Sequence, residues 1–197
     1  MPDQSLLSRP VGDFLAAVAS VSEPAPAGGS VAALTGAASA SLLMLVCRVT
    51  AARGAAVAPE FAQVLGRAEA LQQRLARMID ADARAFQNLM AVRRLPRSNA
   101  FERTTRRVAL KQALGRATHS PLEIAAACAD LVAIADRVES LATGEIVSDA
   151  RVARTLARAA LVSSLDTVEQ NLPHVDDADQ RRAMERELTT LRNALSS

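Results

Sequence analysis

Apolar residues recur at spacings of three and four along most of this chain, and no segment alternates apolar and polar residues with the period of a strand. The clearest pattern lies between residues 61 and 90, where the apolar positions form one continuous stripe on a helix: Phe61, Val64, Leu65, Ala68, Leu71, Leu75, Met78, Ile79, Phe86, Leu89 and Met90. Because Pro59 and Pro96 flank this stripe, we expect a long amphipathic helix that ends before Pro96.

Turn-forming residues divide the remaining chain into six further segments with a helical pattern. We expect helices at about residues 10–21, 30–52, 100–118, 121–143 and 148–171, and a last one that starts in the acidic segment 176–179. The proline- and glycine-rich residues 22–29 are interpreted as an irregular loop. No repeat or linker interrupts this order. The sequence therefore predicts an all-α single domain over residues 1–197, with about seven packed, mostly antiparallel helices.

The composition supports helices that pack closely on small side chains. Half of the residues are apolar but only 2% are aromatic, and the hydrophobicity comes mainly from alanine and leucine, which favour helices. In the segment 30–52, four small residues allow close helix contact: Ala33, Gly36, Ala37 and Ala40. The uncharged run Ser30–Cys47 is nearly long enough to span a bilayer. It is rich in Ala, Ser, Gly and Thr, so we expect a helix buried on all sides of a soluble bundle and no membrane association.

Charge and cysteine content exclude several classes of protein. The net charge is +2 and the arginines are mostly interleaved with carboxylates, so a nucleic-acid surface is not expected. Cys47 and Cys128 lie far apart in apolar stretches, which predicts two buried free thiols and a reducing, cytoplasmic location. The two histidines, His119 and His174, cannot form a histidine-rich metal site, so no metal is expected.

Two charged residues fall on apolar helix stripes. Asp82 lies between Met78 and Phe86 on the stripe of the long helix, where a carboxylate must be paired, neutralised or placed at a cavity. Either a structural ion pair with an arginine or a functional-site carboxylate explains it. Arg106 lies on the stripe of the next helix and either neutralises Asp82 or shares a polar cavity with it.

Three other features have a structural and a functional interpretation. Gly28, Gly29 and Ser30 lead into a helix, where they form either a turn with a Ser30 cap or a backbone binding site for an anion or a carbonyl oxygen. Ser148 and Asp149 are first of all a helix cap. A third feature, usually a solvated face, is a stripe of three arginines that could attract an acidic substrate tail: Arg151, Arg154 and Arg158.

Four short motifs follow one another between residues 24 and 172. They are PAPAGGSVAA at 24–33; DADARAF at 80–86 with Met90 and Leu95-Pro96 after it; Arg106 about fifteen residues before Pro121-Leu122; and Ser148-Asp149 opening a helix that ends at Asn171-Leu172. In this order and spacing they resemble the cyclodeaminase domain of formiminotransferase-cyclodeaminase and its stand-alone relatives, the methenyltetrahydrofolate cyclohydrolases. The resemblance covers most of the chain.

The resemblance implies an all-α fold, a homodimer and a tetrahydrofolate site without metal or redox cofactor. It implies either hydrolysis of 5,10-methenyltetrahydrofolate to 10-formyltetrahydrofolate or cyclodeamination of 5-formiminotetrahydrofolate, with proton transfer at one carbon. Asp82 is the expected acid–base residue, with Asp149 as a second candidate. Arg106 would orient Asp82 or anchor the folate. The expected substrate contacts come from Gly28, Gly29, Ser30 and Ser148.

Several positions depart from the family pattern. Alanine replaces one glycine of the glycine triplet, at Ala27, and the lysine-rich segment and tyrosine are missing around residues 53–56. Lys111 stands for an expected glutamine and Thr167 for an expected asparagine, and another asparagine is missing near Gly144. These changes support an alternative interpretation, in which the chain keeps the fold but acts as an inactive folate-binding or helical interaction protein.

Overall fold

The computed structural model describes residues 5–21, 26–53 and 58–196, and every regular element in these ranges is helical. This confirms the predicted all-α class. Residues 22–25 of the expected loop and Gly54 lie outside the described residues. The elements are η1 Leu6–Ser8, α1 Val11–Val18, α2 Gly28–Ala52, α3 Ala58–Arg93, α4 Ala100–Leu141, α5 Val147–Asn171, η2 Leu172–His174 and α6 Ala178–Ser196.

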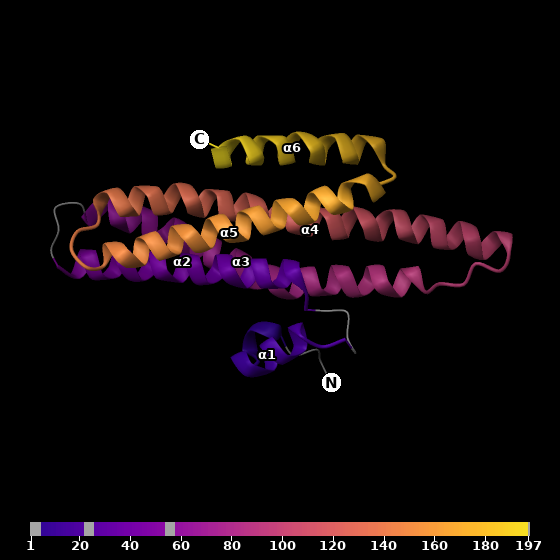
Figure 1. The fold of residues 1–197 in the computed structure, drawn as a ribbon, viewed down its shortest axis with the longest axis horizontal. Coiled ribbons are helices and arrows are strands. Elements are labelled where there is room, and N and C mark those ends of the chain that lie inside the picture. The colour runs from indigo at the N-terminus through magenta and orange to yellow at the C-terminus, as the bar shows by residue number, and fades with distance from the viewer. Residues whose placement is uncertain (1–4, 22–25, 54–57, 197) are drawn as a thin grey trace.

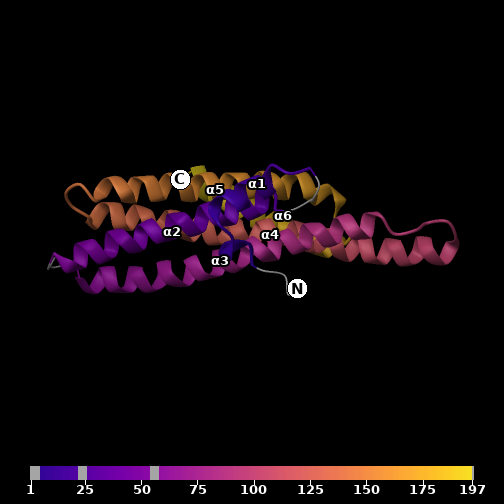
Figure 2. The same ribbon diagram turned by 90° about the horizontal axis from the view of Figure 1, so that it is seen from below.

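Helices α2 to α5 form an antiparallel bundle, with α6 along one side and α1 on another (Figures 1 and 2). Ser39 of α2 donates from Oγ to the carbonyl oxygen of Ala153 of α5 at 2.7 Å, which joins the middle of α2 to the first turns of α5. Helices α3 and α4, with 36 and 42 residues, are longer than the 25-residue α2 and α5. They therefore continue past the other two as a two-helix hairpin (Figure 1).

Helix α4 is one element where the sequence predicted two. The expected break between residues 118 and 121 is wrong, because the helix passes through Pro121 without ending. Proline inside a helix costs about 3 kcal/mol through its missing N–H and a steric clash. Pro121 is buried, and the apolar residues that follow it pack in the core, including Leu122 and Ile124. Tertiary packing offsets the local preference to stop.

Two predicted caps are also wrong. Helix α2 starts at Gly28, so Ser30 lies inside its first turn, and Ala27 at the cap position makes no side-chain hydrogen bond. Helix α5 starts at Val147 without a side-chain cap, and Ser148 donates instead to the carbonyl oxygen of Glu145 at 2.8 Å. The predicted bounds of α3 are confirmed to within a few residues.

The small residues of α2 lie where the core needs them. Ala33 and Ala40 are fully buried, and a Cβ at Gly36 would lie only 2.9 Å from Cys128 Sγ. Cys47 and Cys128 are both free and buried, as predicted. The close approach of α2 to α4 therefore depends on the absence of a side chain at Gly36.

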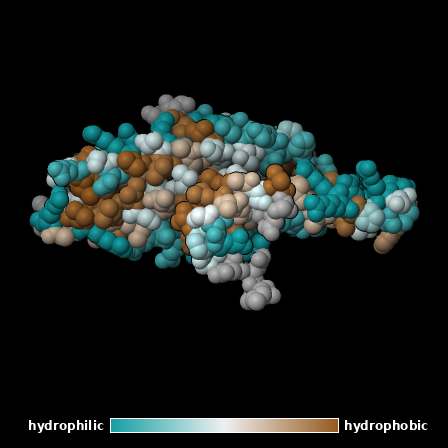
Figure 3. Space-filling view, turned by 60° about the horizontal axis from the view of Figure 1, so that its bottom comes forward, coloured by the Kyte–Doolittle hydropathy of each residue, from teal (hydrophilic) through white to brown (hydrophobic). Residues whose placement is uncertain are grey.

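Helix α2 is not buried on all sides, contrary to the prediction. It is long and apolar enough to cross a membrane, but 56% of its most apolar stretch is buried inside the protein. The remaining face reaches the surface, where Val31 is 36% and Leu45 44% exposed. Figure 3 shows a broad apolar area on the face of the molecule that carries α1 and α2. The bundle covers α2 with α3, α4 and α5, and on its fourth side α1 covers only a part, through Phe14.

Candidate active site

A cavity of about 290 Å³ lies where α2 and α5 end against the continuing α3–α4 hairpin. This volume is close to the lower end of the range for small-molecule pockets, roughly 300 Å³. Four helices supply its lining: Ala27, Gly28, Gly29, Asp82, Ala85, Phe86, Leu89, Arg93, Ala117, Thr167, Gln170 and Asn171. The unequal lengths of the helices create the cavity, because two of the four walls of the bundle stop there.

Asp82 is the carboxylate of this cavity. It is 9% exposed and receives one hydroxyl hydrogen bond on each oxygen. Ser30 Oγ donates to Oδ2 at 3.2 Å, and Ser120 Oγ donates to Oδ1 at 3.1 Å. The Ser30 hydroxyl also lies 3.0 Å from the carbonyl oxygen of Ile79, so two acceptors share its one proton. Two hydroxyls hold the side chain in place, and no cation among the described residues pairs with it.

Opposing effects set the protonation of Asp82. Burial raises the pKa of its carboxyl above the usual value, and this is the largest effect. Hydrogen bonds from the Ser120 hydroxyl, the Ser30 hydroxyl and the Ser30 backbone amide lower the pKa but do not cancel the effect of burial. A carboxyl whose pKa is raised above its usual value holds a proton more readily, which suits a group that must take and return one.

The first turn of α2 forms the wall that faces Asp82. A Cβ placed on Gly29 would lie 2.5 Å from Asp82 Cγ, whereas one on Gly28 would meet nothing within 4 Å. The positive end of the α2 dipole and the Ser30 amide face the carboxylate. Gly29 is therefore needed so that Asp82 can approach the helix end that has no side-chain cap.

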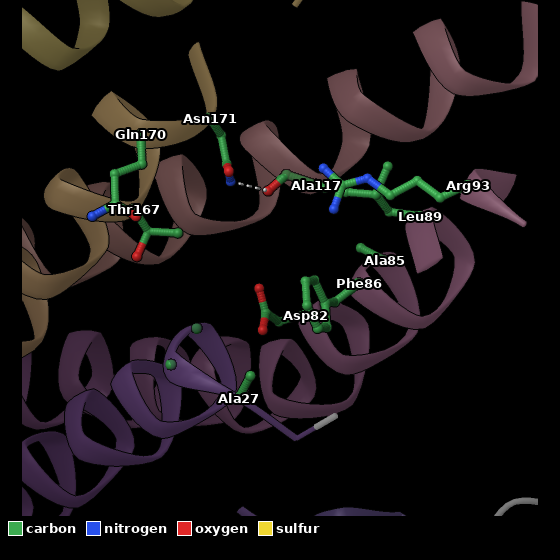
Figure 4. Close-up of a pocket in the computed structure, with 12 residues that line it drawn as sticks. Ala27, Asp82, Ala85, Phe86, Leu89, Arg93, Ala117, Thr167, Gln170 and Asn171 are labelled. Atoms are coloured by element: carbon green, nitrogen blue, oxygen red, sulfur yellow. Dashed lines mark hydrogen bonds between the residues drawn. The ribbon is translucent and has the colours of Figure 1, made fainter. Parts of the chain in front are cut away.

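The other walls combine apolar and hydrogen-bonding groups. Phe86, Leu89 and Ala85 extend along α3, and the side chain of Arg93 reaches back toward Ala117 (Figure 4). Thr167, Gln170 and Asn171 face them from the last turn and a half of α5. One carboxylate, one guanidinium, two amides and an aromatic ring can hold a flat heterocycle that carries both donors and acceptors.

Arg106 does not join this site. Its Nη2 donates to the carbonyl oxygen of Arg93 at 3.2 Å, near the tip of the hairpin, and it is not among the lining residues. Along α4 it lies about 21 Å from Ser120, given a rise of about 1.5 Å per residue. Arg106 therefore neither neutralises Asp82 nor faces the cavity in this structure, and both interpretations offered for it are corrected.

Ser148 and Asp149 also lie far from the Asp82 of the same folded chain. They occupy the first turn of α5, whereas the cavity touches the opposite end of that helix at Thr167. The two positions are about 28 Å apart along the helix axis. The expectation that this motif borders the Asp82 cavity is wrong for a single chain, because α5 runs antiparallel to α2.

The arginine stripe of α5 follows the structural interpretation. Arg151 and Arg154 form ion pairs with Glu139, at 2.8 and 3.3 Å. Arg158 donates to the carbonyl oxygen of Leu195 at 3.1 Å. These contacts stabilise the packing of α5 against α4 and α6.

Sequence reasoning missed Ser120, Arg93 and Gln170. Ser120 was hidden because a helix boundary was expected at this position. Arg93 lies at the end of a helix, where cations are common for electrostatic reasons alone. The motif that ends at Asn171 did mark the correct end of α5, and Thr167 was noted as a departure.

Comparisons with known proteins agree with this geometry. The family model described as Formiminotransferase-cyclodeaminase matches residues 10–190. A methenyltetrahydrofolate cyclohydrolase of Methylorubrum extorquens is 35% identical over 166 residues, which are 83% of this chain and 79% of that protein. A formimidoyltransferase-cyclodeaminase of Sus scrofa is 30% identical over 98% of this chain, which covers only 36% of that longer protein.

The fold has a close counterpart among solved structures. The crystal structure of formiminotetrahydrofolate cyclodeaminase from Thermotoga maritima superposes with a TM-score of 0.82 at 23% sequence identity, over 96% of this chain and 91% of that one. The family model covers far more than half of the residues. The chain therefore belongs to the formiminotransferase-cyclodeaminase family.

Proposed function

We propose that this protein is a one-carbon folate enzyme that hydrolyses 5,10-methenyltetrahydrofolate to 10-formyltetrahydrofolate. The observation that carries the proposal is the buried Asp82 carboxyl, with its raised pKa, at the wall of a cavity lined by amides and an aromatic ring. The similarity to the cyclohydrolase of Methylorubrum extorquens over most of both chains supports this reaction. The cyclodeaminase relatives support ring closure of 5-formiminotetrahydrofolate as the second candidate.

In the proposed reaction, the carbon that bridges N5 and N10 of the folate accepts water. Asp82 takes one proton from the attacking water, which gives a neutral tetrahedral intermediate. The bond from the carbon to N5 then breaks, N5 receives the proton from Asp82, and the hydroxyl of the intermediate releases its proton to solvent. Water and folate yield the formyl product and one proton.

No metal or redox cofactor is part of this proposal, because addition of water changes no oxidation state and needs only proton transfer. Cytoplasmic location is part of it. Burial raises the pKa of Cys47 to about 11 and that of Cys128 to about 12, so both remain protonated, unreactive thiols. Two free thiols without a disulfide fit a reducing compartment.

We further propose a homodimer that covers the open side of α2. Val31 and Leu45 on that side are exposed, and nearby α1 exposes Val11 and Leu15, 74% and 60%. An apolar area of this kind on a long helix needs a partner surface. Equilibrium sedimentation at micromolar concentration tests this: the expected mass is twice 20.7 kDa, and a monomer contradicts the proposal.

An antiparallel dimer would also explain the motif at Ser148 and Asp149. A Cβ at Gly144 would lie 3.7 Å from Arg53 Nη1, so the loop before α5 lies beside the end of α2. If two copies pair along α2 in opposite directions, the start of α5 in the second copy approaches the Gly28 end of α2. Ser148 and Asp149 would then border the cavity across the dimer.

Titration of the purified protein with 5,10-methenyltetrahydrofolate tests the proposed function. We expect the methenyl absorbance to decay faster than with Asp82→Asn protein, which controls for uncatalysed hydrolysis. Release of ammonia from 5-formiminotetrahydrofolate would instead identify the cyclodeaminase reaction. Binding of folate without turnover in either assay overturns the enzyme proposal in favour of a folate-binding protein.

A further inference from the structure

Pro121 leaves a backbone carbonyl of α4 without its usual partner at the edge of the cavity. In a regular helix the N–H of residue 121 would donate to the carbonyl oxygen of residue 117, four positions earlier. Proline has no N–H, and α4 continues through Pro121. The carbonyl that loses this bond belongs to Ala117, which is one of the residues that line the cavity.

One side chain from across the cavity reaches this oxygen. Asn171, at the end of α5, donates from Nδ2 to the Ala117 oxygen at 3.4 Å (Figure 4). N–H···O hydrogen bonds usually measure 2.7–3.2 Å, so this contact is long and weak. A carbonyl oxygen has two lone pairs, and the second can accept another donor while Asn171 stays in place.

The same turn of α4 supplies a second group to the site. Ser120, directly before the proline, donates to Asp82 Oδ1 at 3.1 Å. Ser120 thus holds the carboxylate of the cavity while Ala117 lines the cavity directly, and both belong to the helix turn that precedes Pro121. Proline in the interior of a helix removes one hydrogen bond and so lowers the stability of the helix. Here the missing hydrogen bond leaves a carbonyl oxygen free to accept another donor near Asp82.

We propose that the Ala117 carbonyl oxygen, freed by Pro121, accepts a hydrogen bond from a ring N–H of the bound folate and so fixes its orientation relative to Asp82. This rests on the proposed function, since it assumes a ligand with N–H groups on a flat ring. The described cavity offers N–H donors from Arg93, Gln170 and Asn171. Side-chain acceptors come from the two amides and from Asp82, whose oxygens already accept from Ser30 and Ser120. A backbone acceptor complements them, because the pyrimidine half of a folate carries both donors and acceptors.

Pro121→Ala tests this by supplying the missing N–H. The restored helix bond occupies the Ala117 carbonyl, so the dissociation constant for 5-formyltetrahydrofolate, measured by calorimetry, should rise about 3- to 10-fold, as for a lost neutral hydrogen bond. The thermal midpoint should rise as well, because alanine replaces proline inside a helix. The added amide should exchange slowly with deuterium, which checks that the helix bond has formed.

Two controls separate this effect from others. Gly66→Ala stabilises α3 at an open position with nothing within 4 Å of the new Cβ, and it should leave binding unchanged. Ser120→Ala removes a hydrogen bond that lowers the pKa of Asp82, so it should shift the pH dependence of binding upward. Pro121→Ala should leave that pH dependence in place. A shift like that of Ser120→Ala would overturn the proposal, because the proline would then act through Asp82.

A measurement on the unaltered protein covers the case in which Pro121→Ala does not fold. With ¹⁵N-labelled 5-formyltetrahydrofolate and ¹³C-carbonyl alanine, we expect a coupling across the hydrogen bond from a ligand N–H to one alanine carbonyl. Additional ¹⁵N-threonine labelling identifies the carbonyl signals of alanines that precede a threonine, because the labelled carbonyl is then bonded to ¹⁵N. Two alanines meet this condition, Ala117 and Ala142. Ala142 is not among the residues that line the cavity.

The outcomes distinguish failure of the Ala117 acceptor from failure of the proposed folate function. Weaker binding by Pro121→Ala at unchanged pH dependence, or the coupling to Ala117, supports the carbonyl acceptor. Normal binding by a folded Pro121→Ala protein, or no coupling, overturns the acceptor and leaves the proposed function standing. If the unaltered protein does not bind folate at all, the proposed function and the acceptor both fail.

Discussion

The carboxylate of Asp82 lies so close to Gly29 that a Cβ on the glycine would be 2.5 Å from Asp82 Cγ. Contacts this short do not occur, so any side chain at position 29 must displace Asp82 from its hydrogen bonds with Ser30 and Ser120. The glycine loop and the aspartate motif are thus one structural unit, although 53 positions separate their central residues.

Gly29→Ala should therefore impair the site more than the fold. We expect turnover of methenyltetrahydrofolate to fall by about 10-fold or more, since misplacement by about 1 Å can cost 10²-fold. The matched substitution Gly28→Ala has room for its Cβ and should not lower the unfolding midpoint. Steady-state kinetics and thermal denaturation of both variants check this. Full activity of Gly29→Ala would show that Asp82 can move without consequence.

Gly36→Ala should lower the free energy of unfolding instead. Its Cβ would lie 2.9 Å from Cys128 Sγ and 3.1 Å from Leu75 Cδ1, both in the buried core between α2, α3 and α4. Overpacking of this kind costs about 1–3 kcal/mol. Urea denaturation measures the loss, with Gly66→Ala as the control expected to be neutral or stabilising. Equal stability of Gly36→Ala and the unaltered protein would contradict the close packing of α2.

Local patterns predicted α3 well because that helix has a polar and an apolar side, whereas α2 was recognised by its uncharged run of small residues. The apolar stripe from Phe61 to Met90 predicted α3. Its position inside that stripe indicated that Asp82 is either ion-paired or placed at a cavity, and the structure places it at a cavity. The small residues of α2 indicated its close packing. These inferences needed only helical periodicity and the energetic cost of burying a charge.

What failed depended on tertiary structure. Packing around Pro121 keeps α4 continuous, and this cannot be read from a proline that normally ends a helix. Because α5 runs antiparallel to α2, its last residue Asn171 lies at the cavity of the same chain, and Asp149 in its first turn lies at the far end. Arg106 lies several turns too far along α4 to reach Asp82, and it donates instead to the carbonyl oxygen of Arg93.

The two thiols should be unreactive in the folded protein. Burial raises the pKa of Cys47 to about 11 and of Cys128 to about 12, so at pH 8 almost no thiolate forms and reagents cannot reach either sulfur. Ellman's reagent should label neither cysteine under native conditions and both in denaturant. Rapid labelling of the native protein at either position would contradict the described core.

Asp82 should make stability depend on pH in a direction opposite to that of an ion pair. Its folded pKa is raised above the unfolded value, so its contribution to stability is fully present below the unfolded pKa and is lost as pH rises through the folded pKa. In the Asp82→Asn variant, the side chain at position 82 is uncharged at every pH, so it adds no pH dependence to stability. The free energy of unfolding of Asp82→Asn, relative to the unaltered protein, should therefore increase between pH 4 and pH 7.5. A relative decrease would mean that a cation, such as Arg93 of the same cavity, lowers the pKa of Asp82.

Turnover should depend on Asp82 more than on any other side chain of the cavity. Asp82→Asn keeps the volume and one oxygen acceptor, so Ser30 and Ser120 can retain contacts and the fold should persist. The amide can neither take a proton from water nor return it to N5, and loss of such a group costs about 10²- to 10⁴-fold. We expect kcat to fall by at least about 10² while 5-formyltetrahydrofolate still binds in a calorimeter. A variant that binds the folate and keeps its turnover within a few-fold would remove Asp82 from the mechanism, and one that unfolds would indicate a structural role for the carboxylate.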